Sequence, residues 1–195
     1  MSCIYIDWLT VSNFFNNQSV GAFLGAFSAF ILVVLNDRRR ELIKVRNLRA
    51  EVQVNLENAK AKLETVRRNR SMLREQNLVM PAPILKFNTA ITRQLSAEIL
   101  DRLTLNQRQA IDALCYTMEE TDSLLEEIRI QAQLPSSALK PADQLKKAER
   151  LLKGFGDTIV NLKRFIEMCN NYISGNYKVI VTKQYDRLDY EEPLT

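Results

Sequence analysis

Apolar residues follow two patterns along this chain, one continuous and one periodic. The continuous run, Ser19 to Leu35, reads SVGAFLGAFSAFILVVL and contains no charged residue and no proline. At 1.5 Å per residue it would form about 25 Å of helix, close to the shortest length that crosses a hydrocarbon core. The alternative, a buried core helix of a small domain, would carry a polar face, which this run lacks. The run therefore predicts a transmembrane helix over residues 19–36.

After this run, apolar residues recur every three or four positions, as they do on one face of a helix. No glycine or proline occurs from Asp37 to Asn77, so the membrane helix is expected to continue directly into a second, charged helix. Pro81 and Pro83 would end that helix, because proline removes a backbone donor and clashes with the preceding turn. The apolar stripe of this helix comprises Val45, Leu48, Val52, Leu56, Ala59, Leu63 and Val66.

Three more helices are expected farther along the chain. A short one covers residues 85–103, with apolar residues at spacing four. The next covers residues 104–134 and begins with Thr104 and Gln107, which fit a capping box. The last extends from about Pro141, a favoured first position, to about Gly175.

The last helix carries the most regular apolar stripe, with steps that alternate between three and four residues. Such a seam resembles a coiled coil and indicates packing against another long helix. Its candidate packing residues are Leu145, Leu152, Phe155, Ile159, Leu162 and Ile166, continued by Cys169 and Ile173.

The segment Tyr177 to Lys183 is rich in β-branched residues and resembles a strand. We expect an extended tail over the bundle; the alternative is pairing with a strand of another subunit or of a partner. The predicted fold is therefore all-α. One N-terminal transmembrane helix continues into an antiparallel cytosolic bundle of three to four long helices, with a short extended C-terminal tail. The expected segments are residues 1–18 (interfacial, outside), 19–36 (membrane), 37–175 (bundle) and 176–195 (tail).

The charge distribution gives the membrane helix an orientation. Residues 37–76 hold 12 basic and 6 acidic residues, a surplus of +6 in a chain whose formal net charge is +4, whereas only Asp7 is charged before the apolar run. Positive residues stay on the cytoplasmic side, so the N-terminus is predicted outside and the C-terminus in the cytoplasm, with a bacterial inner membrane as the expected location. Anionic lipid headgroups are the expected contacts of Arg38, Arg39, Arg40, Lys44, Arg46 and Arg49.

Nucleic acid is the alternative partner for the basic residues farther along this helix, Lys60 to Arg74. The sequence disfavours it, because this helix has no aromatic residue on which bases could stack.

The membrane run contains a pattern of small residues, Gly21, Gly25 and Ala29, spaced four apart. Such spacing lets two helix backbones approach closely in lipid and favours association of the spans. No ionisable side chain lies inside the run, which argues against a proton or ion transporter.

The composition offers few residues that could form a catalytic site. The chain has no histidine, which excludes Ser-His and Cys-His pairs and His-ligated metals. Three cysteines occur without CxxC spacing, and no glycine-rich phosphate loop is present. We therefore expect a protein that is not an enzyme and binds no cofactor or metal.

These patterns favour a membrane-anchored helical scaffold or interaction protein that forms homo-oligomers or recruits a protein partner. The alternative is an oligomeric membrane effector or pore-forming channel, of a stress or antiviral defence type, gated by its cytosolic helices.

Overall fold

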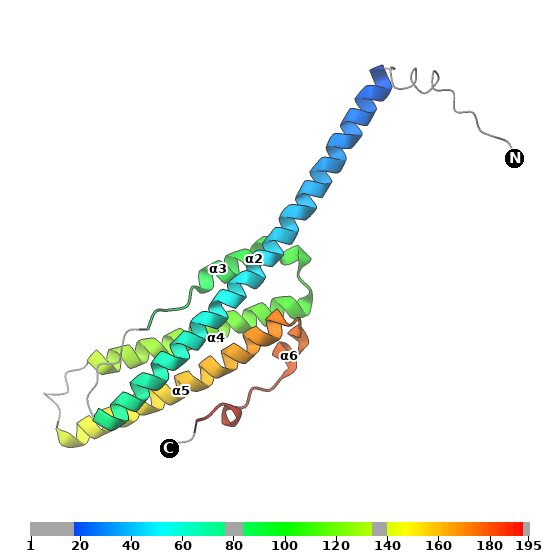
Figure 1. The fold of residues 1–195 in the computed structure, drawn as a ribbon. Coiled ribbons are helices and arrows are strands. Elements are labelled where there is room, and N and C mark those ends of the chain that lie inside the picture. The colour runs from blue at the N-terminus through cyan, green and yellow to red at the C-terminus, as the bar shows by residue number, and fades with distance from the viewer. Residues whose placement is uncertain (1–17, 77–83, 134–139, 193–195) are drawn as a thin grey trace. The chain divides into compact units, whose positions relative to one another are not determined.

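The computed structural model describes residues 18–76, 84–133 and 140–192, and every regular element in these ranges is a helix. The chain divides into two units, one that ends at Lys44 and one that begins at Val45. The all-α prediction is confirmed. The helices, shown in Figure 1, are α2 (Gln18–Gln76), α3 (Thr89–Glu98), α4 (Leu105–Gln133), α5 (Pro141–Ile173) and α6 (Tyr177–Thr182), with 3-10 turns at Leu100–Arg102 and Arg187–Asp189.

Helix α2 continues without a break from the apolar run into the charged sequence that follows it, as predicted. Beyond Lys44 its apolar stripe becomes a buried face, whereas Val45, the first member, remains partly exposed. This burial of one face explains why so charged a helix belongs to the bundle, since packing of an apolar stripe supplies most helical stability in proteins. The buried members are Leu48, Val52, Leu56, Ala59, Leu63 and Val66.

The two following long helices begin as the sequence predicts. At the start of α4, the Gln107 backbone N–H donates to Thr104 Oγ1 (3.3 Å), and the Thr104 N–H donates to Gln107 Oε1 (2.8 Å). This is the predicted capping box, which satisfies backbone donors that the first helical turn leaves free. Pro141 stands at the beginning of α5, where its missing N–H costs no helical hydrogen bond.

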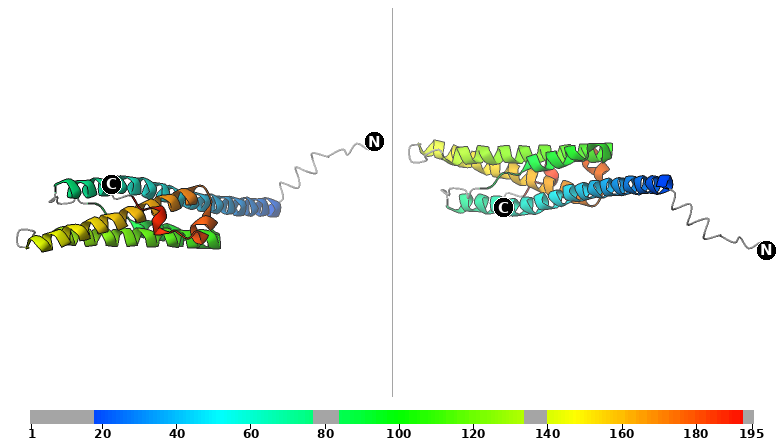
Figure 2. Two further views of the ribbon diagram at one scale, coloured as in Figure 1. Left: turned by 90° about the horizontal axis from the view of Figure 1, so that it is seen from below. Right: turned by 90° about the horizontal axis from the view of Figure 1, so that it is seen from above.

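In the unit that begins at Val45, helices α2, α4 and α5 run alongside one another around one apolar core (Figure 2). Helix α5 is antiparallel to both others (Figure 1). Its carboxyl end lies beside the start of this part of α2, where Arg49 donates to the carbonyl of Ile173, the last residue of α5. Helices α4 and α5 approach closely at Gly154, where an added Cβ would lie 3.0 Å from Ile128 Cγ1. These contacts give the antiparallel bundle that the sequence predicts.

The expected extended tail at residues 176–195 is wrong for its first part, which is helix α6. Gly175, with φ of +81°, reverses the chain after α5, and α6 then packs back on the bundle. Ile180 is buried and the Tyr177 ring meets Tyr172 edge-on, with centroids 5.0 Å apart. This packing overrides the β propensity of the segment, because intrinsic preferences amount to no more than about 1 kcal/mol per residue.

The helix predicted over residues 85–103 is also shorter than expected. Residues 84–88 are irregular, α3 covers Thr89–Glu98, and the chain then tightens into the 3-10 turn at Leu100–Arg102. Residues 1–17 of the predicted interfacial segment and the two prolines after α2 lie outside the described residues, whereas Gln18, the last residue of that segment, is the first residue of α2.

Candidate functional site

The amino-terminal part of α2 is the candidate membrane span. Among the described helices it alone is long and apolar enough to cross a membrane, and its most apolar stretch has no buried residue. Phe23, Phe27 and Phe30 are all exposed, Phe23 by 69%, and the rings of Phe23 and Phe27 stack with centroids 6.3 Å apart. An apolar surface of this kind marks contact with lipid or with another protein.

The small residues of this helix leave one face without cover in the single chain. Gly21, Gly25 and Ala29 are exposed, and a Cβ added at either glycine would meet no atom within 4 Å. The backbone on this face is therefore accessible to a neighbouring helix, as close packing of helices in lipid requires.

The basic residues that follow the apolar run have different environments. In the first unit, Arg38, Arg39 and Arg40 are exposed, and Lys44 is half-buried with a partner of its own. In the second unit Arg46 is exposed, whereas the Arg49 guanidinium caps the carboxyl end of α5 through the Ile173 carbonyl. Arg49 thus has a structural contact that its position in a basic sequence did not indicate.

The seam of α5 faces the interior of the chain's own bundle. Phe155, Ile159 and Leu162 are buried, Leu152 and Ile166 are half-buried, and Leu145 is 64% exposed. The buried face is also wider than the seam, since Leu151, Thr158, Phe165, Met168 and Tyr172 are buried as well. Most of the seam is therefore occupied within one subunit and is not free to pair with a second chain.

The segment that follows α6, residues 183–192, is tied to α5 by charged and phenolic groups. Lys183 Nζ lies 2.5 Å from Glu167 Oε1 and 3.3 Å from the Tyr190 hydroxyl, which itself donates to Glu167. Lys163 Nζ donates to the Tyr190 carbonyl (3.1 Å). Burial, and then the hydrogen bond to Glu167, raise the pKa of Tyr190 to about 12.

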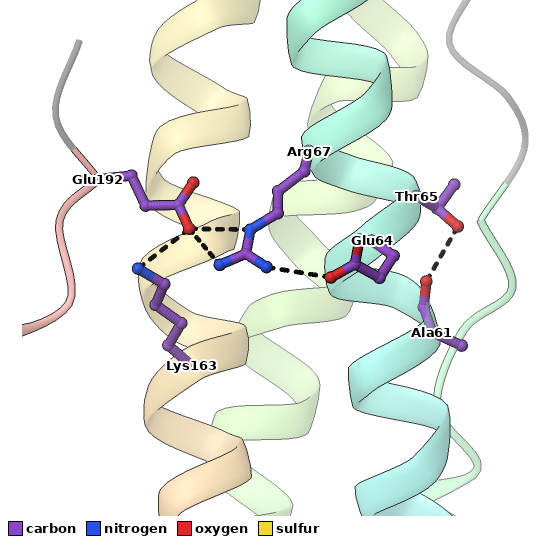
Figure 3. A network of polar contacts seen from close by, with 6 residues as sticks. All are labelled: Ala61, Glu64, Thr65, Arg67, Lys163 and Glu192. Atoms are coloured by element: carbon purple, nitrogen blue, oxygen red, sulfur yellow. Dashed lines mark hydrogen bonds and ion pairs between the residues drawn. The ribbon is translucent and has the colours of Figure 1, made fainter. Parts of the chain in front are cut away.

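Glu192, in the same segment, joins α2 to α5 (Figure 3). Its Oε1 accepts from Arg67 Nε (2.8 Å) and from Arg67 Nη2, and it lies 3.1 Å from Lys163 Nζ. Arg67 also reaches Glu64 on its own helix (3.0 Å). Partial burial acts to raise the pKa of Glu192, but the hydrogen bonds from Arg67 and Lys163 outweigh it and lower that pKa.

A buried lysine, Lys62 on α2, and a half-buried carboxylate, Asp122 on α4, lie close to Phe87, and sequence reasoning missed both. Lys62 Nζ lies 4.3 Å from the centroid of the Phe87 ring, and Asp122 accepts the Phe87 N–H at 2.8 and 3.1 Å. Burial lowers the pKa of Lys62 and raises that of Asp122. The sequence contained an indication that Lys62 is buried: it stands three residues after Ala59 and directly before Leu63, on the apolar face of the helix.

The described residues contain no cluster of three or more His, Cys, Asp or Glu side chains that could hold a metal ion. Cys115 and Cys169 are buried free thiols, and burial raises the pKa of Cys115 to about 11. A buried thiol of this kind is a poor nucleophile, because the thiolate is the reactive form. Comparison with protein-family models, with curated proteins and with solved structures finds no match for this chain.

Proposed function

We propose that this protein is a single-pass membrane anchor for a helical interaction domain, with its N-terminus outside and its bundle in the cytoplasm. The observation that carries the proposal is the apolar part of α2, which has no charged residue and no buried residue, whereas the helices that follow it pack around a core. Lipid is the partner that such a surface fits. The basic residues that follow it support the orientation and contact with anionic headgroups.

In this proposal, copies of the protein form oligomers through contacts between their membrane helices. The uncovered face at Gly21, Gly25 and Ala29 supports it, since nothing within the chain occupies that face. The burial of most of the α5 seam also favours association through the membrane helices, because it leaves little of that seam free for contact between subunits. A second subunit cannot use that seam without unfolding the bundle, so the membrane helix is the better candidate for contact between copies.

Cross-linking of the full chain in native membranes, followed by sizing in lipid nanodiscs, tests this proposal. We expect a discrete dimer or trimer that Gly21→Leu and Gly25→Leu disrupt, because the added side chains separate the backbones. Phe27→Leu is the matched control: it places the same side chain on the opposite face and should leave the oligomer intact.

A strictly monomeric chain with no co-purifying protein would refute the scaffold. A ring of about six or more subunits would refute it in favour of the pore-forming effector, with loss of membrane potential as the second readout.

A further inference from the structure

A cavity of about 370 Å³ lies in the second unit, between the carboxyl end of α2, the first half of α5 and residues 187–192. Its volume is within the range of small-molecule sites. On one side α5 contributes Leu152, Gly156 and Val160, which share a helix face at spacing four. A Cβ added at Gly156 would meet nothing within 4 Å, so the backbone there opens directly on the cavity.

Arg70 lines the opposite side and is only 9% exposed. Its Nε is buried without a hydrogen-bond partner, and no ion pair of Arg70 occurs within the described ranges. A guanidinium removed from water without an acceptor is unfavourable, so such groups are normally paired. Nothing in the described bundle supplies this acceptor.

The other charges around the cavity are largely compensated. Arg187 pairs with Asp157 (2.5 Å) and Glu191 (2.6 Å), and Glu192 is held by Arg67 and Lys163. Glu149 and Lys153 stand one turn apart at the rim with opposite charge. The lining as a whole holds four basic and three acidic residues, a formal surplus of one positive charge.

We infer that this cavity binds a small anion, a phosphate or carboxylate group on an apolar body. The anionic group accepts from Arg70, whose planar guanidinium suits the oxygens of either group. The apolar body rests on Leu152, Gly156 and Val160. This inference does not depend on the proposed function, because the cavity lies wholly within the unit that begins at Val45.

Phenyl phosphate is the probe, titrated by calorimetry into the full chain in detergent micelles. Inorganic phosphate tests the anionic group alone, and phenol tests the apolar body alone. We expect phenyl phosphate to bind at least about tenfold more tightly than either, since only it uses both sides of the cavity. Equal binding of phenol and phenyl phosphate, or no binding of phenyl phosphate, would overturn the inference.

Arg70→Met separates a ligand role from a structural one. It should weaken phenyl phosphate binding about tenfold or more while leaving the melting temperature of the free protein unchanged or higher, because an unpaired buried charge is removed. Arg68→Met, at an exposed position two residues earlier, is the matched control and should change neither quantity. Retained affinity in Arg70→Met, or a melting temperature well below that of Arg68→Met, would contradict the inference.

Gly156→Leu gives an independent readout. It fills the cavity and leaves Arg70 in place, and it should abolish phenyl phosphate binding without unfolding the bundle. Undiminished binding in this variant would place the ligand elsewhere.

Discussion

Two glycines of α5 make a matched pair that tests the packing of the bundle. In a helix interior, glycine is less favourable than alanine by about 0.8–1.0 kcal/mol. At Gly156 the added methyl group meets open space. Gly156→Ala should therefore stabilise the protein by about 1 kcal/mol.

At Gly154 the same substitution creates a contact of 3.0 Å with Ile128 Cγ1 and one of 3.5 Å with Ile128 Cδ1. Favourable carbon contacts lie at about 3.5–4.0 Å, and overpacking of a core typically costs about 1–3 kcal/mol. Gly154→Ala should therefore be neutral or destabilising by up to about 2 kcal/mol, because the overpacking cancels or exceeds the gain in helix propensity.

Ile128→Ala isolates the cause of this difference. Ile128 is 5% exposed, so its truncation alone should cost about 2–5 kcal/mol. In that background the crowding is gone, and Gly154→Ala should now stabilise by about 1 kcal/mol, as Gly156→Ala does in the wild type. Coupling of this kind is expected only between residues in contact.

Thermal unfolding of the full chain in micelles, followed by circular dichroism, has the necessary resolution. For a chain of this size, about 1 kcal/mol moves the melting temperature by about 2–4 °C. Equal effects of the two glycine substitutions in the wild type, or no change in the Gly154→Ala effect on truncation of Ile128, would refute the close approach of α4 and α5.

Two further predictions concern the core of the bundle. Phe155→Ala should cost about 3–5 kcal/mol because the ring is 1% exposed, whereas Leu145→Ala should change the free energy of unfolding by less than about 0.5 kcal/mol; comparable losses would mean that the seam packs along its whole length. The second concerns pH: burial raises the pKa of Cys115 from 9.0 to about 11, so the unfolded thiol ionises first. The stability that wild type holds over Cys115→Ala should be fully present below pH 9 and fall by about 1–3 kcal/mol between pH 9 and 11; denaturant titrations of both proteins measure it, and parallel pH profiles would contradict the shift.

Periodicity was sufficient to predict the long helices, because an apolar stripe records which face of a helix is buried. The stripe from Leu48 to Val66 and the capping box at Thr104 are both observed. Periodicity does not record where the facing helices end, so Leu145 continues the seam in sequence although its side chain is exposed.

Contacts between distant residues were beyond prediction. Helix α6 depends on tertiary packing of Ile180 and Tyr177 that a β-branched sequence does not indicate. Arg67 and Glu192 are 125 residues apart, and the sequence does not indicate that these two charged residues form an ion pair with each other. The environment of Arg70 was equally unpredictable, because the sequence places this residue in a basic helix and only the fold shows that it lines a cavity.

The central claim, a span with its N-terminus outside and its bundle in the cytoplasm, is tested most directly by labelling of cysteines in intact bacterial cells that express the chain. Cys115 and Cys169 are buried, so a maleimide that cannot cross membranes should not reach them in the folded protein. The account predicts labelling of Cys3 in intact cells. In a Cys3→Ser protein, Ser174→Cys, at an exposed position after α5, should react only after the cells are permeabilised. The reverse pattern, or a chain that alkaline carbonate releases from the membrane fraction, would contradict it.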